Sequence, residues 1–208
     1  DDKKESHFKR QTNWYKKFND VCSGKSYICK SYSINYEFIM KEVTIVSALF
    51  NIERENMDGR KWDEYLKWFD ITLKLECPMY LFITEDLREF VEERRTKIPT
   101  EIIIQTTEDI PYIHLKEPIQ KILDSDDYKN NISDPHRIEC KHSMYPVIQY
   151  SKFPWLEKAA EENLFNSNYF LWLDAGGSRF FDGCGLDGQY PGENAIESLK
   201  SMGESFLV

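Results

Sequence analysis

Asp174 is the residue of this sequence whose type and position point most directly to chemistry. It follows the apolar run Tyr169–Leu173 directly, and Gly176 and Gly177 come soon after it. A carboxylate at the end of a buried strand is costly unless it binds something, and glycine lets a ligand approach the backbone closely. A divalent cation that bridges Asp174 to a diphosphate satisfies this carboxylate, because Mg²⁺ and Mn²⁺ prefer oxygen ligands. The alternative is that Asp174 stabilises a turn or a helix end through backbone hydrogen bonds.

Polar residues also follow two earlier apolar runs. Asn51 and Arg54 come after the first run, and Glu85 and Asp86 come after the second. Ligands of open parallel sheets bind beyond the carboxyl ends of the strands, so we expect these side chains to converge with Asp174 at one edge of a sheet. For Glu85 and Asp86 the alternative is that they favour the N-terminus of the following helix through its dipole.

The elements that must position these residues alternate along the chain. Apolar runs predict buried strands at residues 43–50, 79–83, 101–105 and 169–173. Helical spacing predicts helices at 60–75, 87–95, 119–123 and 143–163, with residues 106–140 mainly an irregular excursion. We expect Pro146 and Pro154 to break or kink the last of these helices. The alternation predicts an α/β fold with a mostly parallel, Rossmann-type sheet flanked by helices.

The chain of 208 residues suits one α/β domain. Residues 1–42 show no clean periodicity and are predicted to be an irregular N-terminal extension, so the domain comprises residues 43–208. Few residues follow Asp174, and the chain ends on the apolar Phe206-Leu-Val208. We therefore expect a domain that is truncated at its C-terminus.

Composition excludes several classes of protein. The net charge of -9 argues against nucleic acid as the main partner. No run of about 18 apolar residues is present, so no membrane span is expected in this chain. The five cysteines are scattered without a CxxC pair, a pattern that fits neither a zinc site nor a dense disulfide framework.

The segment from Tyr150-Ser-Lys-Phe to Leu173-Asp-Ala-Gly176 resembles the HtrL/YibB family of glycosyltransferase-like proteins. The resemblance extends back to Thr44–Asn51 and Met79–Asp86, and it covers about residues 43–182 in the order of the family. It implies a GT-A-type fold that transfers a sugar from a nucleotide donor, with a UDP-sugar favoured, to the hydroxyl of a glycan or protein acceptor. The compartment stays open between the cytoplasm and the lumenal face of a glycosylation compartment.

The resemblance also implies roles for residues at the strand ends. Phe50, Asn51 and Arg54 would line the nucleotide pocket. Glu85 and Asp86 would lie near the base or the ribose of the donor.

The last part of the resemblance concerns the diphosphate. Lys152 is the candidate cation for it, with an exposed helix charge as the alternative. Asp174 matches the position of the DxD metal motif of GT-A enzymes and would hold Mn²⁺ or Mg²⁺. The residue two places on is Gly176 rather than a second aspartate, which departs from that motif and weakens the expected metal affinity. Gly176 is expected to border the donor. No residue is identified as the general base.

Two other functions compete with sugar transfer. One is a binding module that kept the GT-A fold without activity, which the missing second carboxylate favours. The other is a phosphohydrolase of the haloacid dehalogenase type, whose aspartate nucleophile is normally followed two residues later by a second aspartate, where this chain has Gly176. Asp182 and Asp187, in a glycine-rich segment, are further candidates for acceptor or metal contacts.

Overall fold

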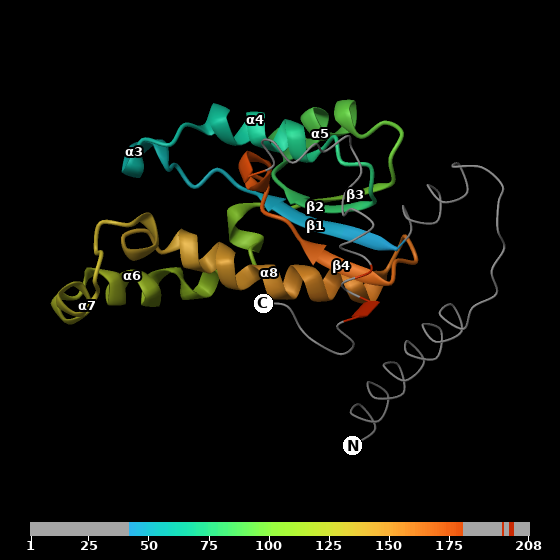
Figure 1. Cartoon of the computed structure of the whole chain (residues 1–208). Coiled ribbons are helices and arrows are strands. Elements are labelled where there is room, and N and C mark those ends of the chain that lie inside the picture. Colours follow the sequence, from blue (N-terminus) through green and yellow to red (C-terminus); the bar gives the residue numbers. More distant parts are fainter. Residues whose placement is uncertain (1–41, 181–196, 198–199, 202–208) are drawn as a thin grey trace, which may run out of the picture. The chain divides into compact units, whose positions relative to one another are not determined.

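The computed structural model describes residues 42–180, 197, 200 and 201. Its centre is a sheet of four strands in the order β3-β2-β1-β4 (Figure 1). The strands are β1 (Val43–Leu49), β2 (Met79–Ile83), β3 (Thr100–Ile104) and β4 (Tyr169–Trp172). Every pairing in it is parallel. This confirms the predicted α/β class and the predicted parallel sheet.

The order in which strands are added to the sheet reverses at β1. The chain runs from β1 to β2 and β3 on one side, and a long connection then returns it to β4 on the other side of β1. In this register Val43 lies opposite Tyr169, and Val46 lies opposite Trp172. Ligands of open α/β sheets bind beyond the carboxyl ends of the strands at such a reversal of strand order.

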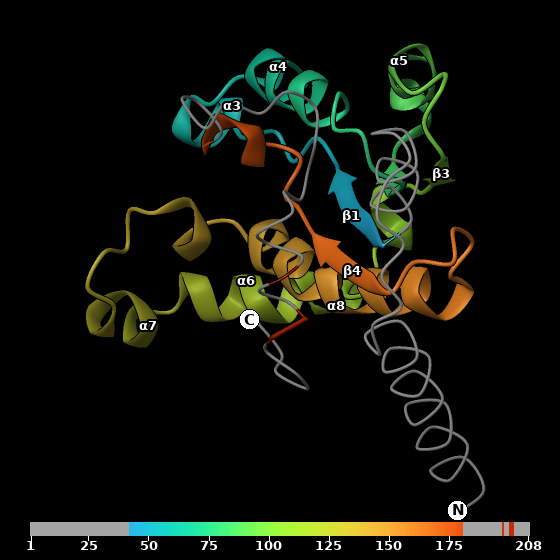
Figure 2. The same ribbon diagram turned by 45° about the vertical axis from the view of Figure 1, so that its right-hand side comes forward.

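Helices cover both faces of the sheet, as Figures 1 and 2 show. On one side lie α4 (Trp62–Thr72) and α5 (Arg88–Arg94), with the short α3 (Glu55–Asp58) before them. On the other side lie α6 (Lys116–Asp124), α7 (Asp126–Asn131) and α8 (Met144–Glu162). Short 3-10 helices complete the described part: η1 (Glu85–Leu87), η2 (Thr107–Asp109), η3 (Ile113–Leu115), η4 (Ile138–Cys140) and η5 (Gly177–Phe180).

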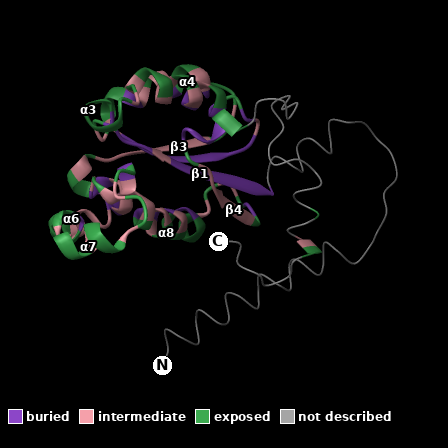
Figure 3. Cartoon of the chain, turned by 60° about the vertical axis from the view of Figure 1, so that its left-hand side comes forward, coloured by how far each residue is buried: buried purple, intermediate pink, exposed green. Residues whose placement is uncertain are grey.

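Two apolar cores follow from the pleat of β1. Ile45 packs in the cluster that includes Phe69 of α4, and Val46 packs in the cluster that includes Trp155 of α8. Successive side chains of a strand point to opposite faces, so a strand that is covered on both faces is apolar along most of its length. Figure 3 shows the buried strand between the more exposed helices.

Of the predicted break or kink in this helix, the break is wrong, because α8 runs unbroken through both of its prolines. Pro146 lies in the first turn, where a backbone N–H has no intrahelical acceptor in any case. Pro154 lies inside the helix and removes one backbone hydrogen bond. Burial of one side of the helix against the sheet compensates for this loss, through Val147, Ser151, Trp155 and Ala159 at four-residue spacing.

Residues 106–140 are more helical than predicted. The expected short helix is present as α6, but α7 and three 3-10 helices were not predicted there. The predicted N-terminal extension lies outside the described residues except for Glu42, and so do Asp182, Asp187 and the apolar chain end. In the described part, no helix combines the length and the apolar character that crossing a membrane requires.

Candidate functional site

A pocket of about 260 Å³ lies in the crevice beyond the carboxyl ends of β1 and β4. Its walls come from four separate segments: residues 48–56, the start of α4, the start of α8, and the loop that follows β4. Outside the first segment the lining residues are Arg60, Trp62, Tyr65, Tyr145, Ile148, Gln149, Asp174, Ala175, Gly176 and Arg179. A pocket at the point where strand order reverses is the usual ligand site of open α/β sheets.

The structure brings most of the predicted site residues to this pocket. Phe50, Asn51, Arg54, Asp174 and Gly176 all line it, although they come from opposite ends of the described sequence. The expected convergence of the first and last apolar strands is therefore present.

Glu85 and Asp86 are not among the residues that line the pocket. They follow β2, which lies on the far side of β1 from β4, and both are exposed in the first turn of η1. Glu85 forms an ion pair with Arg88, with 2.9 Å between Oε1 and Nε. This placement suits the alternative in which the two carboxylates favour a helix N-terminus.

Lys152 reaches Asp174 from α8 without lining the pocket itself. Its Nζ lies 2.7 Å from Asp174 Oδ1, and Trp172 Nε1 donates a hydrogen bond of 2.7 Å to the same oxygen. The ammonium also lies 5.5 Å from the centre of the Trp172 ring. The Lys152 side chain is 17% exposed and that of Asp174 is 59% exposed. The lysine charge is therefore directed at Asp174, and both of these contacts use one carboxylate oxygen.

A stack of aromatic rings supports this pair from the core. Trp155 is 1% exposed and stacks on Phe50, Phe82 and Trp172, with ring centres 5.6, 5.4 and 5.8 Å apart. Its Nε1 donates to Gln105 Oε1 at 3.0 Å. Packing and hydrogen bonding thus fix Trp172, and Trp172 in turn orients Asp174.

Arg54 already has partners within the protein. Its guanidinium forms a two-point contact with Asp58 and donates to the Tyr65 hydroxyl at 2.7 Å. Burial acts to lower the pKa of Arg54, but its contacts with Asp58 and Tyr65 outweigh burial and raise that pKa. The hydrogen bond from Arg54 lowers the pKa of the Asp58 carboxyl. Arg54 therefore serves first to hold the pocket wall together.

Asn51 shapes the turn that follows β1. Its Oδ1 accepts a hydrogen bond of 2.9 Å from the backbone N–H of Glu53, which has a left-handed φ of 56°. Asparagine stabilises such turns through this side-chain contact. The turn carries Glu53 to the pocket, where it is exposed.

Two cations of the pocket were missed by sequence reasoning. Arg60 and Arg179 line it, and both guanidinium groups lie over the ring of Trp68. A surface arginine leaves no periodic pattern in the sequence. The signal that could have indicated these two is a nearby glycine, Gly59 for Arg60 and Gly176 for Arg179, because glycine marks sharp turns of the chain.

Comparison with known proteins identifies the family of this chain. Residues 41–183 match the model of a bacterial protein family of unknown function, HtrL_YibB. The chain is 25% identical over 145 residues to Protein HtrL of Escherichia coli (strain K12), an alignment that covers 64% of this chain and 50% of HtrL. The chain thus matches about half the length of that curated relative. No solved structure matches significantly. Because the family model spans most of the described sequence, the chain belongs to the HtrL_YibB family.

Proposed function

We propose that this chain holds the nucleotide-sugar site of a GT-A-type glycosyltransferase. The observation that carries the proposal is the pocket at the reversal of strand order, with Asp174 at the end of β4 and the Asn51–Arg54 turn at the end of β1. A site of this kind suits a ligand with a planar base and a diphosphate, because the pocket combines aromatic walls with polar groups at strand ends.

The reaction would be a displacement at the anomeric carbon of the donor sugar. An acceptor hydroxyl oxygen forms a bond to that carbon, the bond from the carbon to the diphosphate oxygen breaks, and a base takes the acceptor proton. Negative charge then develops on the leaving diphosphate, and cations of the pocket stabilise it. Lys152 would act indirectly in this scheme, since it orients Asp174.

The predicted Mn²⁺ or Mg²⁺ finds few ligands here. Asp174 supplies one carboxylate, and its Oδ1 already contacts an ammonium and an indole N–H. Within the described residues no three His, Cys, Asp or Glu side chains cluster around a common point. These residues do not make a metal site of their own, so any bound cation would depend on phosphate oxygens of the donor.

A binding module without activity is the second candidate. The ion pair between Lys152 and Asp174 favours it, because an internally neutralised carboxylate is a weak ligand for a metal or a proton. The haloacid dehalogenase mechanism is less compatible with the site. It needs a second carboxylate at position 176, where a Cβ atom would already lie 3.2 Å from Trp68 Cε3.

A thermal-shift screen with nucleotide sugars, followed by a sugar-transfer assay, tests the proposal. A ligand at a hundred times its dissociation constant adds about 2.7 kcal/mol to the free energy of unfolding. We expect a UDP-sugar to give such a shift in the wild type and a much smaller one in Asp174→Asn. The control is Glu85→Gln, which alters a carboxylate at the same sheet edge but outside the pocket.

Absence of any shift with all nucleotide sugars would contradict donor binding. A shift without donor hydrolysis or sugar transfer would instead support the binding module.

A further inference from the structure

Arg60 and Arg179 approach the pocket around one shared ring. The guanidinium carbon of Arg60 lies 5.7 Å from the centre of Trp68, and that of Arg179 lies 5.4 Å from the same centre. Arg179 also lies 4.6 Å from the Phe180 ring. Stacking on an aromatic ring orients a guanidinium while its N–H donors stay available for a ligand.

Neither of these two arginines forms an ion pair within the described part of the chain, although the charge of Arg60 helps to lower the pKa of the Asp58 carboxyl. Arg54, Arg88 and Arg94 each have a carboxylate within ion-pair distance, but neither Arg60 nor Arg179 has one there. The nearby Asp58 accepts a backbone hydrogen bond from Arg60, but its carboxylate is bound by the Arg54 guanidinium. The other acidic residues of the pocket are Glu53, Glu55 and Asp174, and the last is paired with Lys152.

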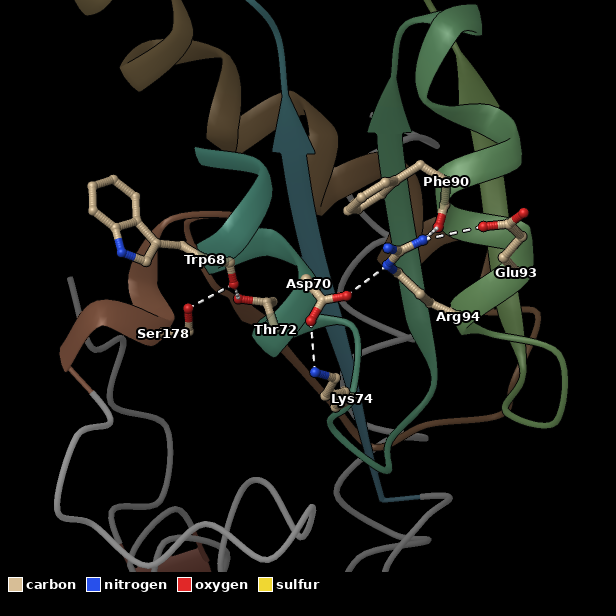
Figure 4. Close-up of polar contacts among 8 residues, drawn as sticks. All are labelled: Trp68, Asp70, Thr72, Lys74, Phe90, Glu93, Arg94 and Ser178. Carbon is tan, nitrogen blue, oxygen red and sulfur yellow. Dashed lines mark hydrogen bonds and ion pairs between the residues drawn. The ribbon is translucent and has the colours of Figure 1, made fainter. Parts of the chain in front are cut away.

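Hydrogen bonds hold the backbone of Trp68, the residue whose ring lies between the two arginines. Ser178 Oγ donates to the backbone carbonyl of Trp68 at 2.6 Å, and Thr72 Oγ1 donates to it at 3.2 Å (Figure 4). Thr72 Oγ1 also lies 3.1 Å from the carbonyl of Ala175. Helix α4, which follows Arg60, and η5, which carries Arg179, are thus held together before a ligand arrives.

Trp68 and Arg179 lie next to Gly176, the position at which a DxD motif has its second carboxylate. A Cβ atom on Gly176 would lie 3.2 Å from Trp68 Cε3 and 3.6 Å from Arg179 Nη1. Where a DxD motif has an anionic side chain that recruits a metal, this chain therefore has an indole and a guanidinium. The protein supplies positive charge there directly.

We propose that Arg60 and Arg179, oriented by Trp68, form an anion subsite that binds the diphosphate of the donor without a metal ion. Two guanidinium groups match the planar, multidentate geometry of phosphate oxygens better than one lysine does. Arg60 and Arg179, rather than Lys152, then meet the charge that develops on the leaving group. This inference rests on the proposed function for the identity of the anion.

Isothermal titration in EDTA tests the subsite with three ligands: inorganic pyrophosphate, UDP and uridine. We expect pyrophosphate and UDP to bind the wild type in EDTA. Arg60→Gln and Arg179→Gln should each weaken both ligands by about tenfold or more, because each removes a charge-assisted contact. Any uridine binding should be unchanged. Arg88→Gln is the matched control, since it removes an arginine that lies outside the pocket. Circular dichroism establishes that the variants fold.

Four results separate the subsite from the proposed function. UDP binding in EDTA that is equal in wild type and both variants overturns the subsite and leaves the donor site standing. Binding that requires Mn²⁺ and is lost only in Asp174→Asn has the same meaning. Arginine-dependent pyrophosphate binding without any response to nucleotide sugars supports an anion subsite and overturns the donor site. If no ligand binds in EDTA, the subsite is wrong, and the transfer assay with Mn²⁺ decides the function.

Discussion

Replacement of Arg95 by methionine should destabilise the fold strongly, although Arg95 does not line the pocket. Its side chain follows α5 and is 5% exposed. The guanidinium donates to one hydroxyl and to several backbone carbonyls of the loops that lead into β2 and β3: Thr100 Oγ1 at 2.8 Å, Leu73 O at 3.1 Å, Leu75 O at 2.6 Å, Cys77 O at 2.6 Å and Pro99 O at 3.4 Å. The Arg95 guanidinium thus supplies the hydrogen-bond donors for these loop carbonyls.

The magnitude follows from these contacts and from burial. The four shorter bonds, at about 1.5 kcal/mol each for a charged donor, amount to about 6 kcal/mol. Burial opposes this, because it lowers the pKa of Arg95 from 12.5 to about 10. That shift corresponds to about 3 kcal/mol against the charged form. The net contribution is about 3 kcal/mol, and Arg95→Met should lower the free energy of unfolding by that amount.

Urea unfolding followed by circular dichroism measures this loss. Arg88→Met is the control, since it removes a half-buried arginine from the start of the helix that Arg95 follows, and its unfolding curve should stay close to that of the wild type. The pKa of Arg95 lies below its ordinary value, so the unfolded state binds more protons only above about pH 10. The loss should therefore be the same at about pH 6 and about pH 9. Equal curves for Arg95→Met and Arg88→Met would refute the reasoning.

Two further substitutions probe the pocket. Gly176→Ala places a methyl group 3.2 Å from Trp68 Cε3, so it should lower the free energy of unfolding by about 1 kcal/mol and weaken UDP binding. Thermal melts measure the change in stability, and titration measures the change in binding. Unchanged binding would show that Trp68 does not orient the subsite. Asp58→Asn should reduce the acid sensitivity of the fold. The Arg54 contact lowers the pKa of Asp58 below its ordinary 3.8, so its stabilisation is present above that value and is lost as the pH falls through the lower folded pKa. Urea curves at about pH 5 and about pH 3 should therefore differ less in Asp58→Asn than in the wild type.

The strands and their parallel arrangement were predictable because buried parallel strands are nearly continuous apolar runs, as Val43–Leu49 is apart from Thr44 and Ser47. The proline rule gave a wrong break in α8, because it weighs one lost hydrogen bond without the packing of Val147 and Trp155 against the sheet. Tertiary burial of this kind leaves no local trace around Pro154.

The candidate site was predictable only in part. Asp174 and Asn51 were found because each stands at the end of an apolar run. Glu85 stands at such an end too, but strand order decides which ends meet, and β2 does not adjoin β4. The sequence also does not show which lysine and arginine side chains form ion pairs in the folded protein. The ion pair of Lys152 and the lack of one at Arg60 within the described residues depend on contacts that are distant along the chain.

The pairing of β1 with β4 has a consequence for the order in which the protein is made. Thr44 and Ser167 form a hydrogen bond of 2.8 Å across 123 residues of chain. Strands β1, β2 and β3 can associate as soon as they leave the ribosome, since their connections are short. The pocket cannot, because one of its walls follows β4. Contacts between such distant segments form late in folding. The nascent chain therefore lacks the pocket until the residues beyond Asp174 have been synthesised, and ligand binding reports that the four described strands have come together.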